Sequence, residues 1–264
     1  MGDQKGEDDG VTAKNDIFSA RWNELLMAFS LLTRLPLPQP DWEGDKPAAR
    51  AVWAYPIAGA SVALLAALVG AFALIIGLSA PLAAICVLFV GIMTTGAMHE
   101  DGLADCADGF WGGWDTARRL EIMKDSRIGA YGVIALGLSL LGRWAALSEI
   151  LAADGYIFAI CAAAIVSRGA MVGVMVLLPP ARQDGLSHTT GRPEIDTTVV
   201  AIGLATAFAL FAGFGAVLFA GLATAGCFYL ARAKIGGQTG DVLGATQQIV
   251  ELAVLVSIAS SLSS

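Results

Sequence analysis

Apolar stretches long enough to cross a bilayer recur along this chain of 264 residues. A helix needs about 20 apolar residues to span the roughly 30 Å of hydrocarbon in a membrane. Such stretches run over residues 52–78, 81–98, 131–151, 156–178 and 242–262. Only 15% of the residues are charged, against about 25% in soluble domains. The sequence therefore predicts an all-α integral membrane protein.

A further apolar region, residues 197–231, is too long for one ordinary crossing. As a single helix it would measure roughly 50 Å at 1.5 Å per residue. Gly213 and Gly215 lie near its middle and favour two short spans joined by a tight turn. This interpretation gives about seven transmembrane helices, and six if the region is one helix.

The positions of Lys and Arg support seven spans. With a hairpin at 213–215, four Lys- and Arg-containing regions fall on one face: the N-terminal region, residues 99–130, residues 179–196 and the residues after 231. The opposite turns, near 79–80, 152–155 and 213–215, contain no Lys or Arg. Because cytoplasmic loops carry the excess of positive charge, we expect the N-terminus and the large loops in the cytoplasm.

The N-terminal region has two parts. Residues 1–16 are polar and predict a disordered cytoplasmic tail, and residues 17–264 form one polytopic membrane catalytic domain. Residues 17–35 have apolar side chains at helical spacing, which predicts an amphipathic helix in the membrane interface or against the bundle. The net charge of −7 argues against nucleic acid as a partner.

An acidic segment follows the second apolar stretch. Asp101, Asp105 and Asp108 are spaced i, i+4, i+7, so on a helix the three carboxylates share one face within about 60°. Crowded carboxylates repel and usually need a cation, and their hard oxygen atoms suit Mg²⁺ or Mn²⁺. His99 and Glu100 lie beside this face. The alternative is a solvated acidic loop.

A basic segment continues the same loop. Lys124 and Arg127 could hold anionic oxygens, and Ser126 lies between them. The next helix is expected to begin near Gly129, where its amides and dipole would favour a phosphate. An acidic metal site followed by a basic helix start suits a diphosphate substrate. The alternative is ordinary positive charge flanking a span.

Other polar residues return to the same face or lie inside spans. Arg182 and Asp241 belong to Gly-containing loops, and Asp241 could complete a metal shell. Arg143, Arg168 and Glu251 fall within apolar stretches and should face the interior of the bundle. They could form a structural Arg–Glu pair or a polar pocket for an anionic substrate, and the sequence leaves both open.

Six segments in one order carry a family resemblance: Leu31–Pro36, His99–Gly109, Ile122–Gly132, Ser167–Arg168, Ala181–Leu186, and Gly237–Ala245 leading to Glu251. Together they resemble the cobalamin synthase family, also called adenosylcobinamide-GDP ribazoletransferase. This chain departs from the family pattern at two points only slightly. The segment 179–182 is looser than the usual Pro-Tyr-Ala-Arg type, and Ser187 stands where the family often has Gly.

The resemblance implies a late step of vitamin B12 assembly in the bacterial cytoplasmic (inner) membrane. Adenosylcobinamide-GDP is joined to α-ribazole or α-ribazole 5′-phosphate, GMP is released, and Mg²⁺ is expected. We expect metal ligation by Asp101, Asp105 and Asp108, with Glu100 or Asp241 as additions. His99 could be a base, a ligand or a hydrogen-bonding orienter. Lys124 and Arg127 would hold the diphosphate, and further substrate contacts are expected from Arg34, Ser126, Gly129, Arg168, Arg182 and Glu251.

Two rival functions fit parts of the pattern. A CDP-alcohol phosphotransferase shares the reaction type and a pattern that begins Asp-Gly-x-x-Ala, but its next motif residue is Arg where this chain has Asp105. A cation transporter should carry its acids near the middle of the membrane, whereas most of these acids follow a span, with Glu251 the main exception. The form of ribazole and the oligomeric state, including a homo-oligomer, stay open.

Overall fold

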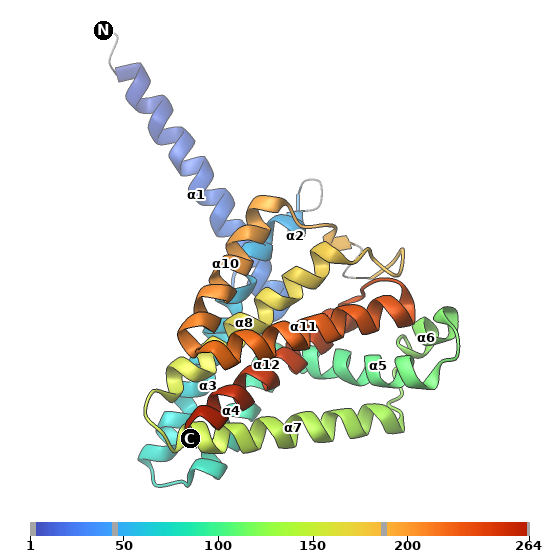
Figure 1. Ribbon diagram of the computed structural model, residues 1–264. Coiled ribbons are helices and arrows are strands. Elements are labelled where there is room, and N and C mark those ends of the chain that lie inside the picture. Colours follow the sequence, from blue (N-terminus) through green and yellow to red (C-terminus); the bar gives the residue numbers. More distant parts are fainter. Residues whose placement is uncertain (1–3, 44–46, 186–188, 263–264) are drawn as a thin grey trace.

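The computed structural model describes residues 4–43, 47–185 and 189–262. Within these residues the chain forms helices, with one isolated bridge between Pro180 and Gln238, so the all-α prediction is confirmed. The elements are α1 Gln4–Leu32, α2 Pro47–Arg50, η1 Ala51–Ala54, α3 Tyr55–Ile75, α4 Ala80–Thr95, α5 Met98–Gly112, α6 Thr116–Ile122, α7 Ala130–Leu151, α8 Tyr156–Leu177, α10 Ile195–Ala212, α11 Phe214–Ile235 and α12 Gly240–Leu262 (Figure 1).

The described helices account for the predicted spans. Six of them are long and apolar enough to cross a membrane, and the bent pair α4–α5 raises the count to seven if it is one span. The region 197–231 is a hairpin, as predicted. It is divided into α10 and α11 at Gly213, whose φ of 113° is open to glycine but strained for other residues.

The corner between α4 and α5 was not predicted. Gly96 and Ala97 both have left-handed backbone conformations, with φ of 68° and 59°, and the chain turns by 87° there. The amide of Arg34 donates to the carbonyl of Thr94 and ties the chain after α1 to this corner. Figure 1 shows the result: α5 runs beside α7 instead of continuing α4.

Helices α8 and α12 form the centre of the bundle. α8 packs between α3 and α10, and α12 packs against α5, α7, α8 and α11. Small side chains at these contacts, such as Ala163 on α8 and Ala67 on α3, let the helices approach closely. Large apolar side chains point outward instead, among them Phe72, Phe89, Leu138, Phe211 and Phe219. This outward apolar surface suits a lipid surrounding.

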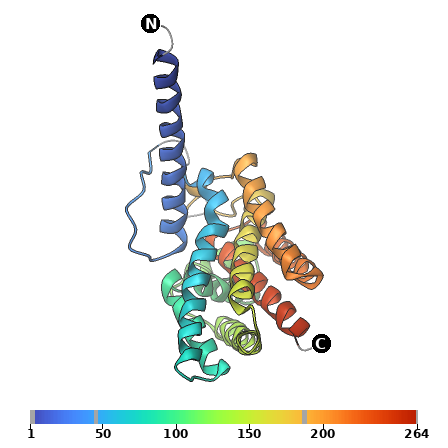
Figure 2. The same cartoon turned by 90° about the vertical axis from the view of Figure 1, so that its left-hand side faces the viewer.

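Helix α1 extends away from the bundle (Figure 2). Its last turns carry buried Met27, Ala28 and Leu32, which pack into the core, so the predicted helix over 17–35 docks by its C-terminal part. The helix begins at Gln4 and therefore includes most of the segment expected to be a disordered tail. The division into tail 1–16 and domain 17–264 stays a prediction.

Candidate active site

The acidic segment is helical, as predicted, and forms α5. Asp101 is exposed and Asp105 is half-buried, one turn apart on the same face. Gly102 packs against the backbone of Asp241, and a methyl group at this glycine would lie 2.8 Å from that residue's carbonyl oxygen. The Asp241 carboxyl group thereby joins the face, within electrostatic reach of Asp105. Two of the three spaced aspartates and the distant Asp241 thus come together.

The third aspartate has a different partner. Asp108 is buried, and its two carboxylate oxygens accept hydrogen bonds from the amides of Gly129 at 2.7 Å and Gly132 at 2.9 Å. It therefore satisfies free amides at the start of α7. The Gly129 amide, expected to bind phosphate, is occupied by this carboxylate. In the described part of the chain, no three His, Cys, Asp or Glu side chains lie close enough together to enclose an ion.

The Asp108 cap predicts a stability effect at Gly132. A methyl group there would collide with the Asp108 carboxylate and lie 3.0 Å from Ile128. We expect Gly132→Ala to lower stability by about 1–3 kcal/mol through overpacking and loss of the cap. Gly137→Ala in the same helix is the matched control, because nothing lies within 4 Å of its added carbon. Equal thermal unfolding temperatures in detergent for the two variants would contradict the capping role.

Glu100 belongs to a network inside the bundle. One oxygen of its buried carboxylate accepts hydrogen bonds from Arg143 at 3.1 Å and Gln248 at 3.0 Å. This places Glu100 on the side of α5 away from Asp105. The structure therefore assigns it to helix packing between α5, α7 and α12, and not to the carboxylate face where an addition to the metal shell was expected.

The intramembrane charges predicted to face inward do so. Arg168 contacts Glu251 at 2.6 Å, and Arg143 lies 3.7 Å from the same carboxylate. Gln247 donates to Glu251 at 2.5 Å and packs beside Gln248. We call this set the buried charge network; its members are Glu100, Arg143, Arg168, Gln247, Gln248 and Glu251. Its two arginines and two glutamates are mutually paired, as charges out of water must be.

The network also forms most of the polar part of the wall of a small cavity whose other lining residues are mostly apolar. The cavity measures about 50 Å³, enough for ordered water, and His99 forms part of its wall. Of the two alternatives left open by the sequence, the Arg–Glu pairs are therefore present, whereas this cavity is too small to be a pocket for a large anionic substrate. His99 is 1% exposed, and its Nε2 has no hydrogen-bond partner among the described residues.

A larger pocket, called here the substrate pocket, opens on the other side of His99. It has a volume of about 310 Å³. Polar residues at its rim include Asp101, Arg182, Asp184 and Asp241, and its apolar wall is formed by Leu32, Tyr55, Met98, Met171, Met175 and Leu243. The Arg182 guanidinium lies 3.5 Å from the Asp241 carboxylate, and its buried Nε has no partner within the described chain. Asp101 on the acidic face of α5, Asp241 and the Arg182 guanidinium therefore meet at one pocket.

The two cations of the basic segment, Lys124 and Arg127, have different partners. Lys124 reaches Asp184 at 2.6 Å, and this hydrogen bond lowers the pKa of Asp184, so the pair joins the loop before α7 to the rim of the pocket. Arg127 turns away and binds Asp125 at 2.6 Å, and its hydrogen bonds lower the pKa of Asp125 to about 2. Ser126 is exposed.

Arg34 lies at the corner of α4 and α5. Its side chain crosses Gly96, where an added methyl group would lie 2.8 Å from the arginine Nε. The guanidinium group is therefore placed at the end of α4 and before His99, close to the start of the acidic helix. Among the predicted site residues, His99, Asp101, Arg182 and Asp241 line the substrate pocket. The others lie outside its lining: Arg34, Glu100, Asp105, Asp108, Lys124, Ser126, Arg127, Gly129, Arg168 and Glu251.

Two groups of residues at the candidate site were not predicted from the sequence. Gln247 and Gln248 are 1% and 2% exposed and complete the buried charge network. Their signal was available, because two glutamines precede Glu251 by one helical turn in an apolar span. The apolar wall of the substrate pocket gave no signal, since Tyr55, Met171 and Met175 lie in spans where apolar residues are expected everywhere.

Comparison with known sequences decides the family. The sequence model of the family described as cobalamin-5-phosphate synthase matches residues 24–259. The chain belongs to this family. No solved structure matches it.

Curated members of the cobalamin-5-phosphate synthase family are similar over nearly their whole length. A relative from Mesorhizobium japonicum is 45% identical, covering 92% of this chain and 95% of its own. One from Bradyrhizobium diazoefficiens is 43% identical over 90% of this chain and 93% of its own. One from Sinorhizobium medicae is 42% identical over 90% and 96%. All three are named adenosylcobinamide-GDP ribazoletransferase.

Proposed function

We propose that this chain is an adenosylcobinamide-GDP ribazoletransferase. It joins adenosylcobinamide-GDP to α-ribazole or α-ribazole 5′-phosphate. A hydroxyl or phosphate oxygen of the ribazole attacks the phosphorus bound to cobinamide, the bond from that phosphorus to the bridging oxygen breaks, and GMP leaves. The observation that carries the proposal is the meeting of Asp101 of the acidic α5 face with Arg182 and Asp241 at one pocket, in a chain of this family.

The carboxylates of this face suit a divalent cation. Asp101, Asp105 and Asp241 offer hard oxygen ligands, and their mutual repulsion would be relieved by Mg²⁺. When bound, the ion would neutralise charge that develops on the phosphate oxygens as GMP leaves. Asp108 holds the start of α7, and Glu100 holds α5 in the buried charge network. These two residues act by positioning the helix that carries the ligands.

The remaining polar residues bind and orient the substrates. Arg182, which lines the pocket, and Lys124, which reaches the lining residue Asp184, bind diphosphate oxygens, with Lys124 released from its exposed pair with Asp184. His99, buried between the pocket and the small cavity, accepts the proton of the attacking hydroxyl. Arg168 and Glu251 lie behind His99 and fix its surroundings. Arg127, Ser126 and Arg34 contact the part of the large substrate outside the pocket.

The active site faces the cytoplasm of a bacterial inner membrane. Support comes from the loops that carry the site, because Lys124, Arg182 and Lys234 lie on the same side as the α5 ligands, whereas the turns at 152–155 and Gly213 have no cation. Both substrates and Mg²⁺ reach the pocket from the aqueous side on this arrangement.

Removal of divalent metal tests the function and the metal together. Purified protein supplied with adenosylcobinamide-GDP, α-ribazole phosphate and Mg²⁺ is expected to release GMP and form the joined corrinoid in equal amounts. After treatment with EDTA, GMP release should fall by about 10²-fold or more, because the charge on the leaving phosphate is no longer neutralised. Both quantities are measured by chromatography.

Two outcomes separate the parts of this proposal. Restoration of GMP release by added Mg²⁺ supports the metal site, and undiminished release in EDTA rejects it while the transferase assignment stands. Absence of GMP release at every metal concentration from protein that is folded rejects the transferase. A liposome flux assay on the same preparation would then test the transporter alternative.

A further inference from the structure

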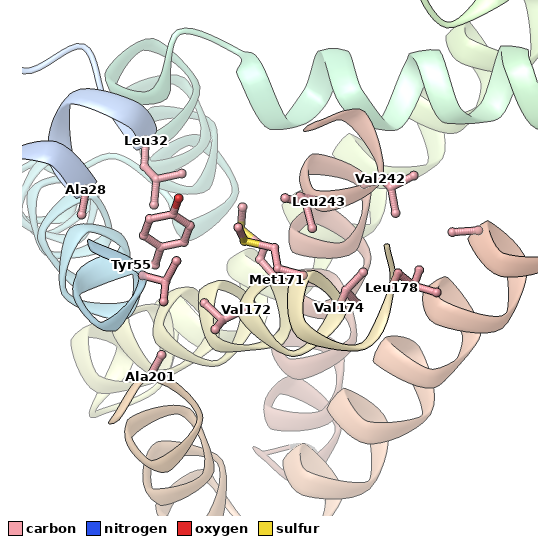
Figure 3. Close-up of a cluster of buried hydrophobic side chains, with 14 of the residues drawn as sticks. Ala28, Leu32, Tyr55, Met171, Val172, Val174, Leu178, Ala201, Val242 and Leu243 are labelled. Atoms are coloured by element: carbon pink, nitrogen blue, oxygen red, sulfur yellow. The ribbon is translucent and has the colours of Figure 1, made fainter. Parts of the chain in front are cut away.

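The substrate pocket has an apolar wall that the transfer chemistry does not use. Tyr55, Met171 and Met175 are only 2–4% exposed and come from α3 and α8. Leu32 from α1 and Leu243 from α12 belong to the same wall. In Figure 3, Leu32 and Tyr55 lie on one side, Leu243 lies on the other, and Met171 lies between them. Five such side chains, drawn from four helices, face one space.

The pocket is therefore two-ended. Asp101, Arg182 and Asp241 at its rim suit a phosphate and a cation, whereas Tyr55 alone among these five wall side chains has a hydrogen-bonding group. His99, Thr190, Gln238 and Thr239 line other parts of the pocket. A ligand that fills it must have one anionic or hydroxyl-bearing end and one apolar end. Binding the apolar end would remove it from water at about 25 cal/mol per Å² of buried surface.

The size of the pocket selects between the two substrates. Its volume of about 310 Å³ lies at the lower end of the roughly 300–1,000 Å³ typical of small-molecule sites. A nucleoside fits such a space. A corrin macrocycle joined to a nucleoside diphosphate is far larger and must lie mostly outside, with only its diphosphate reaching the rim.

The wall chemistry identifies the end that enters. Methionine side chains are flexible and polarizable, and they make favourable sulfur contacts with aromatic rings. Tyr55 adds an aromatic face for offset or edge contacts. A guanine base set against these side chains would meet only the Tyr55 hydroxyl, so most donors and acceptors of its edge would stay unpaired, which costs about 1–3 kcal/mol per group. A benzimidazole-type base presents a single ring-nitrogen acceptor and no donor.

We propose that this wall is the binding subsite for the aromatic base of ribazole, with the base against Tyr55, Met171 and Met175 and the ribose at the rim. The inference rests on the proposed transferase function and adds the orientation of one substrate. It makes α8 a determinant of base specificity, separate from the residues that bind the diphosphate.

The test compares the KM values of the two substrates in a single variant. Met175→Ala removes contacts from the base, so KM for α-ribazole should rise about tenfold or more, while KM for adenosylcobinamide-GDP changes by less than about twofold. Met93→Ala is the matched control, because Met93 is 59% exposed on α4 and outside the pocket. A rise confined to the KM of the GDP substrate would overturn the proposal.

A second measurement uses the unaltered protein, in case Met175→Ala does not fold. The free base of ribazole should inhibit competitively against α-ribazole and not against adenosylcobinamide-GDP, and free guanine should not compete with α-ribazole. Competition by guanine instead of the ribazole base would overturn the subsite. In either outcome the unaltered protein still releases GMP, so failure of the subsite is distinguishable from failure of the transferase function.

Discussion

Replacing Asp105 with Asn is expected to lower turnover by on the order of 10³-fold, the scale for losing a group that stabilises transition-state charge. Asp105 is half-buried on the face of α5 that Asp101 and Asp241 share. Asparagine keeps the size of the side chain but removes its charge and one of the anionic oxygens that a hard cation requires. The measurement is GMP release at saturating substrates over a range of Mg²⁺ concentrations.

The stability of the same variant distinguishes a site residue from a structural one. Asp105 lies among like charges, so Asp105→Asn should unfold at the same temperature as the unaltered protein or higher. Asp154→Asn is the control, since Asp154 is exposed in the turn between α7 and α8 and does not line the pocket. Near-normal GMP release by folded Asp105→Asn would reject the metal site.

Replacing Glu251 with Leu is expected to destabilise the protein by about 3–5 kcal/mol, the cost of breaking a buried ion pair from one side. Glu251 contacts Arg168 at 2.6 Å and lies 3.7 Å from Arg143. Its removal leaves Arg168 without a carboxylate within the network and takes a hydrogen-bond acceptor from Gln247. The measurement is thermal or denaturant unfolding in detergent micelles.

A double variant tests the cause of this loss. Arg168→Met combined with Glu251→Leu removes both charges of the 2.6 Å pair and should recover most of the lost stability, because an apolar replacement of a buried pair is often neutral. Arg143 keeps Glu100 as its partner. If the double variant is as unstable as the sum of the single changes, unpaired charge is not the cause.

Features that depend on local composition were predicted from the sequence. The long apolar stretches predicted α3, α7, α8 and α12, and Gly213 and Gly215 predicted the turn inside the region 197–231. Helical spacing placed Asp101 and Asp105 on one face. These predictions succeed because each rests on residues that lie close together along the chain.

Features that depend on distant contacts were not predicted. The corner at Gly96 and Ala97 requires a left-handed alanine, which no local pattern indicates. That corner turns α5 so that Asp108 meets the amide of Gly129, 21 residues away, and Glu100 meets Gln248, 148 residues away. Regular spacing predicted three equivalent aspartates on α5. In the packed structure, Asp108 instead holds the amides of Gly129 and Gly132, and Asp241 from α12 lies near Asp101 and Asp105.

The buried charge network has a consequence for an enzyme in an energised membrane. Its two arginines contribute +2 and its two glutamates −2, so its formal charge is zero. A single elementary charge moved across the whole field gains or loses about 2.3 kcal/mol for each 100 mV. A neutral group that shifts as a unit does no such work. Voltage changes across the membrane therefore exert no net pull on this network as a unit, although it carries four charged side chains within the spans.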